Sequence, residues 1–162
     1  MSEQNIMNNK GQIVAEYILV IGIIIVILIT MSQILIEESE KNTILESAQI
    51  GAQIGIDKNA YAMYYNDTFN NYMLNYPKLL YPTEISVINI SMMNNNSSII
   101  LQVFLHSDNY LTNNQKEIVG SRVNYYIRKT ISETFNQKNS DLYYENCQTN
   151  NYKIETKKVK WI

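Results

Sequence analysis

A single carboxylate, Glu16, stands inside a long apolar stretch of this chain. From Ile13 to Ile36 it is the only charged side chain, and residues 18–29 contain no polar side chain at all. A charge at the depth of a bilayer costs about 2.5–3.5 kcal/mol even on insertion scales. Glu16 therefore either lies near the membrane interface, as a cap on an ordinary anchor, or has a partner that binds it.

The helix that carries Glu16 is long enough to cross a membrane. The twenty-four residues from Ile13 to Ile36 reach about 36 Å as a helix, more than the ~30 Å of a hydrocarbon core. The stretch is too long for a conventional secretory signal, and no small-residue cleavage site follows it. Lys10 precedes the helix, and three glutamates follow it within residues 37–40. The positive-inside rule therefore predicts a cytoplasmic N-terminus and an external remainder.

The residues around Glu16 resemble a known processing and assembly signal. Lys10-Gly11-Gln12, then Glu16-Tyr17, then the unbroken apolar run are similar to the class III signal peptide of archaeal type IV pilin-like proteins. In that family a membrane aspartyl peptidase on the cytoplasmic side cuts after the Gly, and the apolar helix stays in the mature subunit. The resemblance implies a cut between Gly11 and Gln12, with Lys10 as part of the recognised sequence.

The same resemblance implies a role for Glu16 in assembly. Residues 1–11 would be a cleaved leader, and Gln12 would gain an α-amine one helical turn before Glu16. In a filament, the apolar helices of residues 12–36 would bundle, and Glu16 of one subunit would pair with the Gln12 amine of a neighbour. Such a buried pair adds little net stability but is costly to break, so it fixes register. Val14 stands at the third mature position, where the family often has Ser.

Residues 37–162 predict a small α+β head. The helical pattern continues to about residue 65, and residues 65–82 read as a connection because two prolines disfavour helix there. Gly51 and Gly55 form a small-xxx-small pair that allows close approach of another backbone. They lie on a narrow face of small and apolar residues, at Ile44, Ala48, Gly51, Ala52 and Gly55.

The second half of the head predicts a hairpin, a helix and a final strand. Residues 83–93 and 97–106 are two β-prone runs separated by Asn94–Asn96, which indicates an antiparallel hairpin. Residues 112–139 predict a helix that packs on the sheet and is capped by Thr112 or Asn113. Residues 151–162 predict a C-terminal strand, with residues 142–145 as a candidate partner. In the second run, one face of the strand is apolar, at Ile99, Leu101, Val103 and Leu105.

No arrangement typical of catalysis is found. There is no Gly-rich phosphate loop, no nucleophile elbow and no pair of His or Cys ligands. The single His106 predicts a hydrogen-bonded or surface residue, and the single Cys147 a passive thiol that cannot form an internal disulfide. The net charge of -2 gives no electrostatic case for nucleic acid. We expect no catalytic residue, no metal site and no cofactor.

Two surface features accompany the predicted head. Four Asn-x-Ser/Thr sequons are candidates for N-glycosylation outside the cell, at Asn66, Asn89, Asn95 and Asn96. A basic cluster near the C-terminus is expected to be a solvated strand face, with contact to an anionic surface polymer as the alternative. Its members are Lys153, Lys157, Lys158 and Lys160.

These features favour a structural subunit of an archaeal type IV pilus-like surface filament, used for adhesion. A prepilin peptidase would process it in the cell membrane, and it would then assemble at the cell surface with copies of itself or other pilins. The ligand of the head stays open. Two alternatives remain: a single-pass anchored surface protein that does not polymerise, and a minor subunit that initiates a filament.

Overall fold

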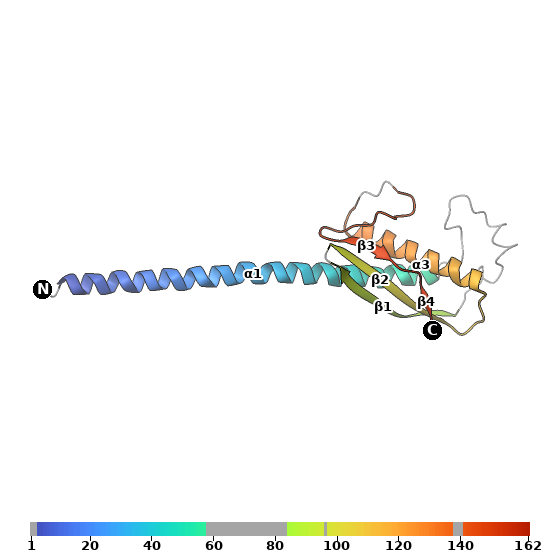
Figure 1. The fold of residues 1–162 in the computed structure, drawn as a ribbon, viewed down its shortest axis with the longest axis horizontal. Helices are drawn as coiled ribbons and strands as arrows, with labels where there is room; N and C mark the ends of the chain where they lie inside the picture. Colours follow the sequence, from blue (N-terminus) through green and yellow to red (C-terminus); the bar gives the residue numbers. More distant parts are fainter. Residues whose placement is uncertain (1–2, 58–83, 96, 138–140) are drawn as a thin grey trace. The chain divides into compact units, whose positions relative to one another are not determined.

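The computed structural model describes residues 3–57, 84–95, 97–137 and 141–162 of the chain. By internal contacts the chain divides into two units, Met1–Asn42 and Thr43–Ile162. The predicted α+β class is confirmed (Figure 1). The described elements are α1 (Glu3–Asp57), β1 (Ile85–Asn95), β2 (Ser98–Ser107), α3 (Asn113–Thr134), β3 (Lys153–Thr156) and β4 (Lys160–Trp161).

Helix α1 carries the whole apolar stretch and continues into the second unit. Every side chain from Gly11 to Ser39 is exposed. From Thr43 onward the helix has a buried face, as the pattern of small and apolar residues predicted. The predicted helical residues 58–65, the connection at 65–82 and the sequon at Asn66 lie outside the described residues.

The predicted hairpin is confirmed. Strands β1 and β2 pair antiparallel, from Ile85 opposite Ser107 to Asn95 opposite Ser98. A register shift lies between Val87 and Asn89. This bulge explains the imperfect alternation of the first run, because one extra residue returns the strand's apolar side chains to the same face.

The C-terminal strand exists, but its predicted pairing with residues 142–145 is wrong. Strand β3 pairs with β2 in parallel, Ser98 opposite Lys153, and β4 continues along the same edge of β2. Because α3 connects β2 to β3, the chain returns to the sheet in the same direction and fills the edge that the hairpin leaves open. Residues 142–145 instead lie in turns, where the Asp141 carboxylate accepts hydrogen bonds from Tyr143 N and Glu145 N at 3.1 and 2.8 Å.

Helix α3 begins at the predicted cap. The Thr112 hydroxyl accepts a hydrogen bond from Gln115 N, and the Gln115 side chain accepts one from Thr112 N, which forms a capping box. The apolar face of α3 packs with β2 and the last turns of α1 in one core. The core residues with no exposed surface are Ile44, Ala48, Ala52, Ile99, Leu101, Val103, Leu105, Val119, Val123, Ile127, Ile131 and Cys147.

The pair Gly51 and Gly55 lies against the backbone of α3. A Cβ added at Gly51 would stand 2.6 Å from Tyr126 O and 2.7 Å from Ile127 Cα, and one at Gly55 would stand 2.8 Å from Val123 Cα. The two helices therefore approach too closely for any side chain at these positions, as the small-xxx-small spacing predicted.

Candidate processing and assembly segment

The apolar part of α1 has no covered face within its own unit. From Ile13 to Ile36 its large apolar side chains are 49–69 % exposed. By length and composition this helix is able to cross a membrane. So much apolar surface is stable only in lipid or against other apolar surfaces, because exposure to water costs roughly 25 cal/mol per Å².

The junction between Gly11 and Gln12 lies inside α1, which runs without interruption from Glu3. A glycine inside a helix costs about 1 kcal/mol relative to alanine. At Gly11 nothing lies within 4 Å of an added Cβ, so packing in this chain does not require glycine there. Gly22 shares this property, whereas Gly51 and Gly55 are required by the contact with α3. Lys10 lies in the same helix, and its side chain is outside the described part.

Glu16 and Gln12 face each other on the same side of the helix. The Gln12 side-chain amide donates a hydrogen bond to Glu16 Oε1 at 3.3 Å, one turn along the helix. Both side chains are exposed, as is Tyr17 at 68 %. The structure thus places Gln12 and Glu16 on one face of the helix and leaves the Glu16 carboxylate exposed.

The described sequons are on the surface. Asn89 is exposed in β1, where it pairs with Phe104 across the hairpin, and Asn95 is exposed at the end of the same strand. Asn66 and Asn96 lie outside the described residues. Asn95 stands beside the hairpin turn, at the last pair of the β1–β2 ladder.

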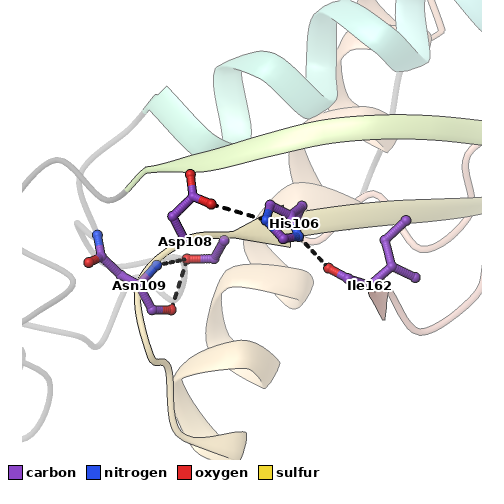
Figure 2. A network of polar contacts seen from close by, with 5 residues as sticks. His106, Asp108, Asn109 and Ile162 are labelled. Carbon is purple, nitrogen blue, oxygen red and sulfur yellow. Dashed lines mark hydrogen bonds and ion pairs between the residues drawn. The ribbon is translucent and has the colours of Figure 1, made fainter.

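His106 is hydrogen-bonded, as expected, and Figure 2 shows its two partners. Nδ1 lies 2.6 Å from the backbone oxygen of Ile162, and Nε2 lies 3.2 Å from Asp108 Oδ1. Both partners are acceptors, so both ring nitrogens donate only when the imidazole is protonated. The hydrogen bond to Ile162 and then that to Asp108 raise the pKa of His106 above its ordinary value of 6.5.

The contact between His106 and Ile162 holds the end of the chain to the sheet. Ile162 N also donates to Leu105 O at 3.0 Å, which continues the pairing of β4 with β2. Sequence reasoning missed both partners of His106. The spacing of Asp108, two residues beyond a strand-end histidine, was a usable signal, whereas nothing local in the sequence points to Ile162.

Cys147 is fully buried beside two polar groups. The Ser132 hydroxyl lies 3.4 Å from its Sγ, and the thiol lies 3.5 Å from Arg128 O. Burial raises the pKa of the Cys147 thiol, which keeps it neutral and poorly reactive. Among the described residues, no group of three or more His, Cys, Asp or Glu side chains is placed to hold a metal ion.

Comparison with protein-family models, with curated proteins and with solved structures finds no match for this chain. The case for function therefore depends on the residues of α1 and on the surface of the head.

Proposed function

We propose that this chain is a structural subunit of an archaeal type IV pilus-like surface filament, made as a precursor and cut between Gly11 and Gln12. The observation that carries the proposal is the Gly11-Gln12…Glu16-Tyr17 pattern, followed in the same helix by an apolar stretch whose side chains are all exposed from Ile13 to Ile36. The precursor would lie in the cell membrane with its N-terminus in the cytoplasm. The mature head would form the outer surface of the filament and serve adhesion.

Gly11 supports the processing step. A peptidase binds its substrate in an extended form, so the helix around the junction must open before it is cut. Glycine lowers that barrier, because it destabilises a helix by about 1 kcal/mol relative to alanine. No packing contact within 4 Å explains the glycine otherwise.

Glu16 supports assembly over simple anchoring. An anchor alone gains nothing from a carboxylate one turn inside its apolar segment. In a bundle of such helices, the Glu16 carboxylate of one subunit would meet the new amine at Gln12 of another, in surroundings with little water. Removing one partner of such a buried pair typically costs about 3–5 kcal/mol, so the pair selects one register among neighbours.

The mass of the N-terminal peptide, measured in membrane and sheared-surface fractions of the native cell, tests processing and assembly separately. A start at Gln12, with or without cyclisation of that Gln, supports the cut, and its recovery from the sheared fraction supports a filament. A start at Met1 or Ser2 found only in membranes would refute both, and would favour a single-pass anchored surface protein. The amount in sheared filaments separates a major subunit from a minor or initiating one.

Two variants with matched controls separate the steps further. Gly11→Val should block the cut and trap the precursor, whereas Gly22→Val, which also meets no neighbour within 4 Å, should be cut normally. Glu16→Ala should be cut yet absent from filaments, whereas Glu37→Ala, beyond the apolar stretch, should assemble. Normal filament yield from Glu16→Ala would remove the assembly role of this carboxylate.

A further inference from the structure

Two adjoining hollows run along one side of α3 in the head. The first, of about 520 Å³, lies between the first half of α3 and the C-terminal segment around Trp161. The second, of about 350 Å³, continues toward Arg128 and Tyr143. Both are lined by Ser121 and Asn124, where they meet. We call the two together the α3 groove. Its length suits an extended ligand, since the helix from Asn113 to Arg128 spans roughly 22 Å.

Hydrogen bonds from the sheet and from α3 hold the C-terminal wall of the α3 groove in place. Gln102, buried in β2, donates from Nε2 to Lys158 O at 2.6 Å. Asn124 donates from Nδ2 to Lys157 O at 2.9 Å. At the floor of the groove, Gly120 lets α3 lie close to Val159, because a Cβ at this position would stand 3.2 Å from Val159 Cβ. These contacts make the hollow a feature of the fold rather than a gap between loose side chains.

The charge in the first hollow is positive. Lys158 forms an ion pair with Glu117, which neutralises that carboxylate. Lys116 also lines this hollow, and its Nζ lies 5.5 Å from the ring centroid of Trp161. Among the described residues, no carboxylate forms an ion pair with Lys116. The hollow therefore holds one positive charge in excess, next to a half-buried aromatic ring.

The polar groups where the hollows meet are an amide and a hydroxyl. Asn124 Oδ1 is buried and has no hydrogen-bond partner among the described residues. Ser121 is exposed beside it. An unpaired buried acceptor is uncommon in proteins, because it loses its hydrogen bond to water without replacement. A ligand that carries hydroxyl donors would supply the hydrogen bond that Asn124 Oδ1 lacks.

We propose that the α3 groove binds an extended acidic carbohydrate. The sugar carboxylate pairs with Lys116, and the ring packs its C–H face on Trp161, whose π-cloud is negative. Sugar hydroxyls bind Ser121 and Asn124, which offer a hydroxyl and an amide oxygen. A charge-assisted hydrogen bond to a carboxylate is stronger than an exposed contact between an ammonium and a ring, so Lys116 can turn toward the ligand. The inference concerns the head alone and holds whether or not the chain polymerises.

Trp161 makes the experiment direct, because it is the only tryptophan of the chain and it lines the groove. The full chain in detergent micelles is titrated with an oligogalacturonate while tryptophan fluorescence is recorded. The comparison ligands are a neutral galacto-oligosaccharide of the same length, sodium acetate at matched ionic strength and a short polyglutamate peptide. We expect a saturable change with the oligogalacturonate, at an affinity at least about tenfold above that for the neutral sugar, as expected for one charge-assisted contact.

Variants are compared by calorimetry, because changes near Trp161 alter its fluorescence directly. Lys116→Ala should lose about tenfold in affinity, and Ser121→Leu, at an exposed position, should block the groove with the head still folded by circular dichroism. Lys129→Ala, on the same helix but outside the lining, is the matched control and should bind normally. Absence of saturable binding, equal affinity for the neutral sugar, or an unaffected Lys116→Ala variant would overturn the proposal. Tighter binding of polyglutamate would overturn it in favour of an acidic peptide partner.

Discussion

Replacement of Gly51 by Ala tests the packing of the head most sharply, because the change adds one methyl group against a backbone. The new Cβ would stand 2.6 Å from Tyr126 O, 2.7 Å from Ile127 Cα and 2.9 Å from Ile127 N. Ordinary contacts of this kind are 3.4–4 Å. None of these three atoms belongs to a side chain that can rotate away. The last turns of α1 must therefore separate from α3.

The expected loss follows from two opposing effects. Overpacking of a core typically costs about 1–3 kcal/mol, and here an opening of 0.5–1 Å would forfeit about a quarter to a half of the dispersion energy across the contact. Alanine in a helix gains about 1 kcal/mol over glycine. Because all three clashing atoms belong to the backbone, the overpacking cost should lie in the upper half of its range, about 2–3 kcal/mol, and the net free energy of unfolding should fall by about 1–2 kcal/mol. The double variant Gly51→Ala/Gly55→Ala should lose less than the sum of the two single changes, because the helices have already separated.

Urea denaturation of the full chain in micelles, followed by Trp161 fluorescence, measures this loss in the head. The unfolding free energy of a small domain falls with urea concentration at a characteristic slope. With that slope, the urea midpoint should fall by about 0.5–1 M. Gly22→Ala is the matched control, because it lies in the same helix with nothing within 4 Å of the added Cβ, and its midpoint should not change. A Gly51→Ala variant as stable as the wild type would show that the two helices are not in close backbone contact.

Three further experiments test single features of the head. The NMR titration of His106, the only histidine, should have its midpoint above 6.5, and Asp108→Asn should lower it. Because the folded-state pKa is raised, the stability that His106 contributes is present below pH 6.5 and is lost as pH rises through the folded value. Thr112→Ala should cost about 1 kcal/mol through loss of the helix cap. Cys147 should react with iodoacetamide at neutral pH only after urea unfolds the head, since its thiol is buried and its pKa is raised.

Each of these predictions has a contrary result. A His106 midpoint at or below 6.5 would show that the contacts with Asp108 and Ile162 do not hold in solution. A Thr112→Ala variant of unchanged stability, measured against Asn114→Ala at the second position of the helix, would contradict the capping box. Labelling of Cys147 in the folded head, at the rate of a free thiol, would contradict its burial.

Local patterns in the sequence predicted most of the helices and strands. They failed for the pairing of strands that are far apart in the sequence. The alternation of Ile99, Leu101, Val103 and Leu105 identified four positions that are all fully buried. The bulge between Val87 and Asn89 could not be located, because a period of two does not say where an extra residue is inserted. The parallel pairing of β3 with β2 depends on the route of the chain through α3, which no local pattern encodes.

On the surface of the head, too, local groups of residues were predicted and contacts between distant residues were not. The lysines near the C-terminus were recognised as a cluster, but Lys116 and Trp161 come together only because β4 lies beside the start of α3. The spacing of Gly51 and Gly55 predicted the close approach of another backbone. Only the structure identifies that backbone as α3, at Val123 and Ile127. The role of a residue whose contacts lie far away in the sequence can be assigned only once the tertiary structure is known.

Neither Gly11 nor Glu16 makes a packing contact in the described part of the chain that requires its residue type. The glycine costs a helix about 1 kcal/mol relative to alanine and makes no contact that needs it. The carboxylate interrupts a stretch that would enter a membrane more easily without it, by as much as about 2.5–3.5 kcal/mol at the bilayer centre. Under the proposed function one sequence of events accounts for both: the cut at Gly11 creates the amine that Glu16 of a neighbour binds. Gly11→Ala and Glu16→Ala should therefore leave the urea midpoint of the head unchanged. If either change destabilises the head, its residue has a role in folding, and the argument for assembly loses that support.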